Sequence, residues 1–188
     1  MSDSHIDKFF EIATDALKKE DVFLAERLAF CETAGFYRDY HQGISFLFET
    51  TLIYLIFREL LANDFPRREN CEVRWEDPYP NNASKKVDLL LKPSSPLPEA
   101  FVEAKIWRKE FGEDLKSDID KMKELPTESR RFMLVFWWDP TDGNTNLKWL
   151  KSELPVKTIH SNLFHTKMRG RDKKIETVNA ILALIELR

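Results

Sequence analysis

Two charged side chains lie inside a segment whose composition is typical of a buried strand. Glu103 and Lys105 belong to the run Phe-Val-Glu-Ala-Lys-Ile-Trp at 101–107. Because residues two apart on a strand point to the same face, both would share one face with Phe101. An unpaired buried charge is costly. The two side chains therefore form a simple ion pair at the edge of a sheet, or they carry out chemistry.

A third charged residue, Asp88, interrupts the apolar run Lys-Val-Asp-Leu-Leu-Leu. A short proline-rich connection separates this run from the strand at 100–107, so the two strands are expected to be antiparallel neighbours with Asp88 near Glu103. Two adjacent carboxylates repel each other, and the pKa of one rises unless a cation lies between them. Their oxygen atoms suit Mg²⁺, or Mn²⁺ in its place. Lys105 would then position or activate a water molecule.

Glu49 is a fourth candidate, from an apolar helix predicted over 42–63. On that helix it shares a face with Ile53 and Ile56. One interpretation is a core carboxylate bonded to a hydroxyl group or an arginine. The other is a carboxylate that reaches the metal site from above the sheet.

The order of these residues resembles the PD-(D/E)xK nuclease superfamily. Asp88, followed by Glu103-Ala-Lys105, is similar to the motif that names the superfamily. Glu49, on a preceding helix, resembles the extra acidic residue that many members carry. Val87 stands where the motif name has proline, and members vary at that position.

The resemblance implies an α/β fold with a restriction-endonuclease-like αβββαβ core, in which helices flank a mixed central sheet. The apolar patterning predicts core elements in that order over 42–63, 71–76, 86–91, 100–107, 111–125 and 131–138, with a loop over 78–82. A single nuclease-like domain would cover 1–188, with its core over 42–138, about half of the chain. Outside the core we expect a helical extension over 1–35, with helices at 6–17 and 22–31, and a variable segment over 139–188, with a strand at 156–159 and a final helix at 173–187.

The activity implied by the resemblance is Mg²⁺-dependent hydrolysis of DNA, as an endonuclease rather than an exonuclease. Asp88, Glu103 and the carbonyl group of Ala104 would hold Mg²⁺, and Glu49 would bind the ion directly or through water, or help to hold a second ion. Lys105 would orient or deprotonate the attacking water and stabilise charge on the phosphate. RNA is an alternative substrate. A different alternative is a non-catalytic, partner-binding or regulatory protein on the same scaffold, similar to an immunity protein.

Charge is distributed unevenly along the 188 residues, whose formal net charge is −3. Residues 1–64 carry six Lys or Arg against twelve Asp or Glu, whereas 65–188 carry twenty-three against twenty. The acidic N-terminal helices could be the surface for a second copy or a protein partner, and basic residues in the rest could contact phosphates. The candidate DNA contacts are Lys116, Lys121, Lys167, Arg169 and Arg171. A solvated helix face or linker is the alternative for each.

The composition, 43% hydrophobic and 32% charged, is typical of folded globular proteins. Cys31 and Cys71 are too few for a disulfide scaffold and lack zinc-finger spacing, so we expect core thiols in a reducing compartment. The longest apolar stretch, 52–57, is far shorter than the roughly 20 residues of a membrane span. With no signal-peptide pattern either, we expect a cytoplasmic protein without membrane contact.

Overall fold

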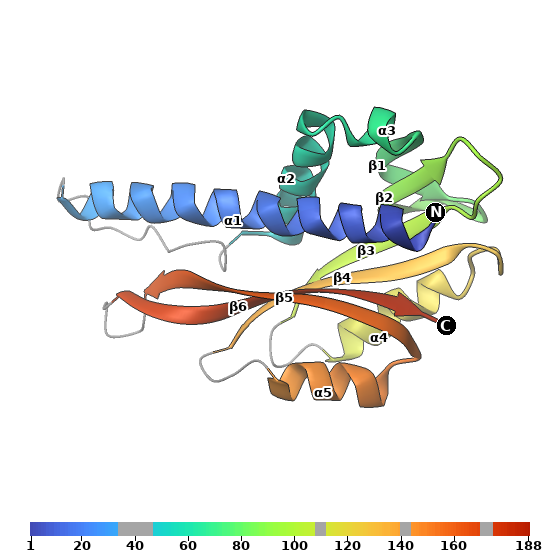
Figure 1. The fold of residues 1–188 in the computed structure, drawn as a ribbon. Coiled ribbons are helices and arrows are strands. Elements are labelled where there is room, and N and C mark those ends of the chain that lie inside the picture. The colour runs from blue at the N-terminus through green and yellow to red at the C-terminus, as the bar shows by residue number, and fades with distance from the viewer. Residues whose placement is uncertain (34–46, 108–111, 140–143, 170–174) are drawn as a thin grey trace.

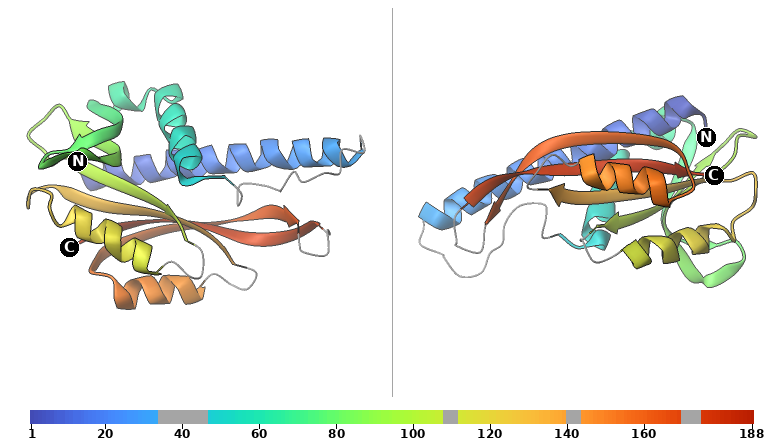
Figure 2. Two further views of the ribbon diagram at one scale, coloured as in Figure 1. Left: turned by 180° about the vertical axis from the view of Figure 1, so that it is seen from behind. Right: turned by 90° about the horizontal axis from the view of Figure 1, so that it is seen from below.

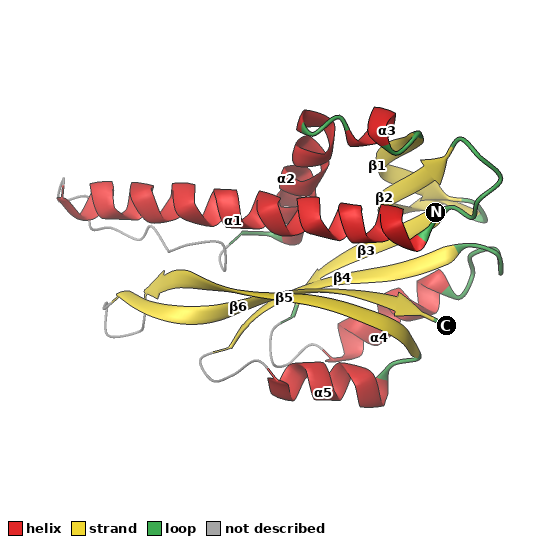
Figure 3. Ribbon diagram, viewed as in Figure 1, coloured by secondary structure: helices red, strands yellow, loops and turns green. Residues whose placement is uncertain are grey.

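The protein is an α/β structure with one mixed six-stranded sheet flanked by helices (Figures 1 and 3). The computed structural model describes residues 1–33, 47–107, 112–139, 144–169 and 175–188. In chain order its elements are α1 (Asp3–Thr33), α2 (Glu49–Ala62), α3 (Phe65–Arg68), β1 (Cys71–Tyr79), β2 (Asn82–Pro93), β3 (Ala100–Ile106), α4 (Gly112–Met122), β4 (Arg130–Asp139), α5 (Asn144–Glu153), β5 (Val156–Arg169) and β6 (Ile175–Leu187).

The strands lie in the order β1-β2-β3-β4-β6-β5. β3 and β4 are parallel, and every other neighbouring pair is antiparallel. A parallel pair needs a crossover connection, and α4 provides it. This crossover places α4 against one face of β3, where the charged residues of that strand lie.

Two apolar layers cover the sheet, one on each face. Val102, Ala104 and Ile106 of β3 belong to the core cluster formed with α1 and α2. Phe101, on the alternate face, packs in a second cluster with residues of α4 and α5. Figures 1 and 2 show α1 and α2 on one side of the sheet and α4 and α5 on the other. Strands that are covered on both faces are expected to be apolar over most of their length, as β3 and β4 are.

The six predicted core elements are present in the predicted order, with shifted ends. The predicted helix over 42–63 is confirmed for the part that forms α2, while its positions 42–46 lie outside the described residues. β1 continues through Pro78 and Tyr79, which the sequence analysis placed in a loop. The short helix α3 is an addition between α2 and β1.

Residues 6–31 form part of one helix, whereas the sequence predicted two helices. The polar stretch at 18–21 between them contains neither glycine nor proline, and it continues the helix. Asp21 within it is buried and accepts a hydrogen bond from the Thr166 hydroxyl group on β5. Among the helices described, including the 31-residue α1, none is long and apolar enough to cross a membrane.

The predicted C-terminal helix at 173–187 is wrong, because residues Ile175–Leu187 form the strand β6. β6 lies between β4 and β5 and pairs with both, and its alternate residues pack in the two core clusters, so its two faces are covered. A continuous apolar run buried on both faces has no period that separates a strand from a helix. The predicted strand at 156–159 is only the first part of β5, and α5 was not predicted. The described residues after β4 are therefore a helix followed by two long antiparallel strands (Figure 3).

Replacement of either of two adjacent residues of β6 should destabilise the protein strongly. Leu184 and Ile185 are both fully buried, in the α1/α2 cluster and the α4/α5 cluster respectively. Leu184→Ala and Ile185→Ala should each lower the free energy of unfolding by about 2–5 kcal/mol in chemical denaturation.

The matched control is Leu163→Ala on β5, where the side chain is half exposed and the expected change is within about 0.5 kcal/mol. A Leu184→Ala variant as stable as the Leu163→Ala control would contradict its burial in a central strand.

Candidate metal and catalytic site

The site begins where the pairing of β2 with β3 ends. The two strands are antiparallel neighbours, as predicted, and their ladder runs from Leu91↔Ala100 to Leu89↔Val102. Beyond that point the Ala104 N–H donates to Asp88 Oδ2 at 2.7 Å, so a side chain takes the place of a backbone partner. Asp88 is therefore held between the two strands.

Glu103 meets Asp88 at this position. Asp88 is close enough for its charge to raise the pKa of Glu103, and Glu103 is only 6% exposed. The hydroxyl group of Tyr79, the last residue of β1, donates to Glu103 Oε1. The sequence analysis missed Tyr79 because it placed this residue in a loop, whereas the side chain is buried. The predicted approach of Asp88 to Glu103 is confirmed.

The environment of this pair favours its protonated forms. Burial, followed by repulsion from Asp88, raises the pKa of Glu103 from its ordinary value of 4.5 to about 8. Burial also raises the pKa of Asp88, although the Ala104 N–H opposes the change. Burial and the Glu103 carboxylate raise the pKa of Tyr79, which keeps its hydroxyl group a donor. At neutral pH the pair therefore retains a proton unless a cation replaces it.

Lys105 forms its ion pairs away from Glu103. Its Nζ lies 3.1 Å from Asp118 Oδ2 and 3.5 Å from Glu49 Oε2, and its side chain is largely buried. Burial alone would lower the pKa of Lys105, but Asp118 and Glu49 outweigh it and raise the pKa. Lys105 is thus held as an ammonium group, and the alternative of a simple Glu103–Lys105 ion pair does not describe this site.

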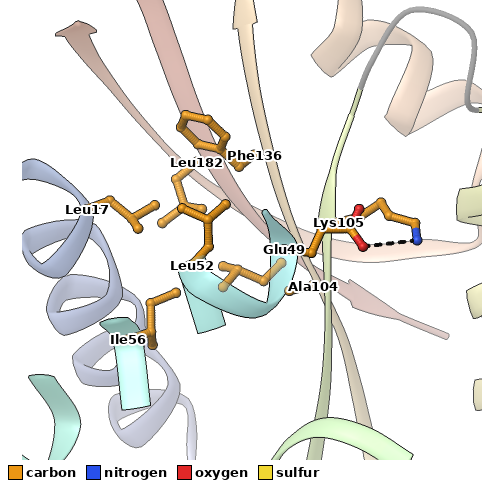
Figure 4. Close-up of a pocket in the computed structure, with 9 residues that line it drawn as sticks. Leu17, Glu49, Leu52, Ile56, Ala104, Lys105, Phe136 and Leu182 are labelled. Carbon is orange, nitrogen blue, oxygen red and sulfur yellow. Dashed lines mark hydrogen bonds and ion pairs between the residues drawn. The ribbon is translucent and has the colours of Figure 1, made fainter. Parts of the chain in front are cut away.

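Glu49 is the first residue of α2, and it reaches the end of β3. Its Oε1 accepts a hydrogen bond from the Ile106 N–H at 3.1 Å, and its Oε2 faces Lys105. Figure 4 shows its carboxylate directed away from the apolar side chains that line the adjoining pocket, and a dashed line joins it to Lys105. The partners of Glu49 are thus a backbone amide and a lysine, rather than the hydroxyl group or arginine considered above.

Asp118 of α4 is a site residue that the sequence analysis missed. It is 5% exposed, and its two oxygens contact Lys105 and Lys121. A signal was present in the sequence, because Asp118 lies three residues after Leu115 and four before Met122, on the apolar face of an amphipathic helix. A carboxylate on such a face needs a polar partner, and Lys105 supplies it.

The carboxylates of the site outnumber its ammonium groups. Glu49 and Asp118 contact the ammonium groups of Lys105 and Lys121, and Asp88 and Glu103 lie beside this group. With all four carboxylates ionised there are two negative charges in excess, and the proton that the Asp88–Glu103 pair retains at neutral pH leaves one. No described lysine, arginine or histidine lies within ion-pair distance of Asp88 or Glu103. Within the described ranges, no three carboxylate, histidine or cysteine side chains are arranged to share an ion. Two carboxylates, one carbonyl group, water and a phosphate oxygen would complete the shell that Mg²⁺ prefers.

The residues predicted to contact DNA are scattered over the chain. Lys121 joins the acidic cluster through Asp118, while Lys116 is exposed on α4. Lys167 and Arg169 lie at the end of β5 with side chains outside the described set, and Arg171 lies outside the described residues. Of the two cysteines, Cys71 is a buried free thiol, as expected, and the side chain of Cys31 is outside the described set.

Comparison with known proteins gives no relative. No family model, no curated protein and no solved structure matches the chain. The resemblance to the PD-(D/E)xK superfamily therefore depends on the residues named above and on where the fold places them.

The stability of the metal-free protein should fall as pH rises through the range set by Glu103. Between 4.5 and about 8 the folded protein keeps a proton that the unfolded chain releases. The contribution of Glu103 to the free energy of unfolding should therefore be greatest below pH 4.5 and should decrease as the pH rises towards 8. Urea denaturation in EDTA at several pH values measures the slope.

The Glu103→Gln variant has no ionisable group at this position, so its free energy of unfolding should decrease less as the pH rises. Glu128→Gln, on the exposed surface, is the matched control and should leave the slope unchanged. A wild-type protein whose stability rises between pH 5 and 8 in EDTA would show that the carboxylate pair does not hold the proton.

Proposed function

We propose that the protein is a Mg²⁺-dependent nuclease that hydrolyses DNA phosphodiester bonds, acting as an endonuclease. The observation that carries the proposal is the meeting of Asp88 and Glu103 where β2 and β3 separate. Two buried carboxylates with no cationic partner among the described residues are costly unless a cation binds them. Lys105 lies two residues along the same strand, in position to approach a bound phosphate.

Each residue has a role that follows from its contacts. Asp88, Glu103 and the Ala104 carbonyl group would hold Mg²⁺, which when bound supplies Lewis-acid chemistry at the scissile phosphate. Lys105, kept as an ammonium group by Asp118 and Glu49, would stabilise negative charge on the phosphate and orient the attacking water. Its ion pairs favour this role over removal of the proton from water.

Glu49 would act on the ion through water or through Lys105. Both of its oxygens already have partners, the Ile106 N–H and the Lys105 ammonium group. This arrangement supports a positioning role more than direct coordination by the same carboxylate.

The order of elements supports a restriction-endonuclease-like core. α2, β1, β2, β3, α4 and β4 follow the αβββαβ order of the superfamily, with α3 as a short addition. Asp88 lies on the second of these strands and Glu103 on the third. β6 and β5 extend the sheet beyond β4.

Replacement of either Glu103 or Lys105 should abolish DNA cleavage and leave the fold intact. We expect Glu103→Gln and Lys105→Ala each to reduce the cleavage rate at least about a hundredfold, since each removes a group that stabilises charge in the transition state. The measurement is cleavage of plasmid, linear duplex, branched and single-stranded DNA, with RNA alongside, in Mg²⁺ and Mn²⁺.

Lys123→Ala is the matched control, because this lysine is exposed on the chain just after α4 and pairs with Asp120. It should cleave as the wild type does. Undiminished cleavage by Glu103→Gln or Lys105→Ala would refute the assignment of these residues.

One observation favours the alternative, a non-catalytic protein that binds a partner. Lys105 is enclosed by two carboxylates, as expected of a polar cluster that is complete without an ion. Metal binding distinguishes the two functions.

Calorimetric titration with Mn²⁺ should show binding that depends on Asp88 and Glu103. Because the pKa of Glu103 is about 8, binding at pH 7 should release a proton, measurable as a dependence of the heat on the buffer. Asp88→Asn and Glu103→Gln should lose this binding. A wild-type protein that neither binds Mn²⁺ nor cleaves nucleic acid would support the partner-binding alternative.

A further inference from the structure

The carboxylate oxygens of the candidate site differ in whether another group already contacts them. Both oxygens of Glu49 have partners, the Ile106 N–H and the Lys105 ammonium group. Both oxygens of Asp118 lie against ammonium groups, Oδ1 against Lys121 and Oδ2 against Lys105. Neither of these carboxylates can turn an oxygen to an ion without breaking one of these contacts.

Asp88 and Glu103 each have one oxygen held by a hydrogen-bond donor. Asp88 Oδ2 accepts the Ala104 N–H at 2.7 Å, and Glu103 Oε1 accepts the hydroxyl group of Tyr79. The oxygens that remain for an ion are Oδ1 of Asp88 and Oε2 of Glu103. The pair therefore supplies two ligand atoms, one from each side chain, and the ion takes its other ligands from elsewhere.

Tyr79 has a fixed position beside Glu103. Its side chain is 3% exposed and packs in the α4/α5 cluster, on the face of the sheet that carries Glu103. The pairing of β1 with β2 shifts register between Pro78 and Tyr79, and irregularities of this kind redirect a side chain. Just beyond, Asn81 Nδ2 donates to the carbonyl oxygen of Glu124 at 2.9 Å, which attaches the β1–β2 turn to the residues that follow α4.

The number of oxygens that a carboxylate gives to an ion distinguishes divalent cations. Mg²⁺ is small, requires a nearly regular octahedron, and usually binds one or two carboxylates and several waters. Mn²⁺ also accepts an octahedron of oxygens. Ca²⁺ is larger, takes roughly six to eight oxygens, and accepts both oxygens of one carboxylate. Two single oxygens therefore suit Mg²⁺ or Mn²⁺, whereas a carboxylate that presents both oxygens suits Ca²⁺.

We propose that Tyr79 is a metal-selectivity residue: by holding Glu103 Oε1, it makes Glu103 a ligand through one oxygen and favours Mg²⁺ or Mn²⁺ over Ca²⁺. Without the hydroxyl group, Oε1 would be a buried acceptor with no donor, which is costly unless the ion binds it as well. Glu103 would then offer both oxygens, an arrangement that Ca²⁺ accommodates better. The inference rests on the proposed metal site, where Tyr79 is a positioning residue that acts through Glu103.

The test is calorimetric titration of the wild-type protein and of Tyr79→Phe with Mn²⁺ and, separately, with Ca²⁺, in the absence of nucleic acid. The substitution keeps the ring in the apolar cluster and removes only the hydroxyl group. We expect Mn²⁺ to bind about tenfold more weakly, as when the hydrogen-bond partner of a metal ligand is lost, and the ratio of Mn²⁺ to Ca²⁺ affinity to fall by about the same factor. Looser packing alone would weaken both ions alike and leave the ratio unchanged.

Tyr54→Phe is the matched control, because it removes the hydroxyl group of a tyrosine that is 45% exposed on α2. It should leave both affinities as they are in the wild type. Tyr79→Leu, which lacks both the hydroxyl group and the ring, should lower the ratio as Tyr79→Phe does. An unchanged ratio in Tyr79→Phe would overturn the inference. A ratio that changes in Tyr79→Leu alone would also overturn it, because the packing of the ring would then be responsible.

The selectivity role and the proposed nuclease can fail separately. Mn²⁺ binding that needs Glu103, with an affinity ratio indifferent to the Tyr79 hydroxyl group, would overturn the selectivity role and leave the nuclease. A lowered ratio in Tyr79→Phe, with no cleavage of nucleic acid by the wild type, would support the selectivity role and overturn the nuclease. A wild-type protein that binds neither ion would overturn the metal site on which both depend.

Discussion

Repulsion between two carboxylates at the separation of β2 and β3 is the constraint around which the rest of the site is arranged. Burial raises the pKa of both Asp88 and Glu103, and repulsion from Asp88 raises that of Glu103 further. The Ala104 N–H and the Tyr79 hydroxyl group stabilise individual oxygens but add no positive charge. A fold optimised for stability alone would separate two such groups or place an ammonium group between them. Departures from local stability of this kind are expected at functional sites.

A second group of charges lies beside the pair and is satisfied within itself. Lys105 could have neutralised Glu103, two residues away on the same strand, but its ammonium group lies between Asp118 and Glu49. Lys121 adds a second contact to Asp118. The lysine is thereby oriented and charged, while the carboxylate pair has no ion-pair partner among the described residues. This division results from three elements, β3, α4 and α2, that converge at the end of one strand.

α2 contributes both to the core and to the candidate site. Leu52 and Ile56 fix the helix in the core, and Glu49 at its first turn contacts Lys105. Tyr54 and Phe57, on another face, meet Trp75 of the edge strand β1. One helix therefore holds Glu49 at the end of β3 and also packs against the edge strand of the sheet.

Local patterns in the sequence were sufficient for the centre of the site. The alternation at 101–106 placed Glu103 and Lys105 on one strand, and the short connection after β2 made Asp88 the neighbour of Glu103, because strands joined closely pair antiparallel. The periodicity at 173–187, in contrast, was misread as a helix. A strand between β4 and β5 is apolar on both faces, so only its pairing partners distinguish it from a buried helix.

Contacts between segments distant in the chain were decided only by the tertiary structure. Asp118 is a site residue because the crossover lays α4 on the charged face of β3, and Tyr79 because β1 continues to the level of Glu103. The sequence by itself determined that a few carboxylates and a lysine lie within apolar segments, where each needs a polar partner. Which lysine meets which carboxylate depends on how three elements pack, and ion pairs across such distances leave no period in the sequence.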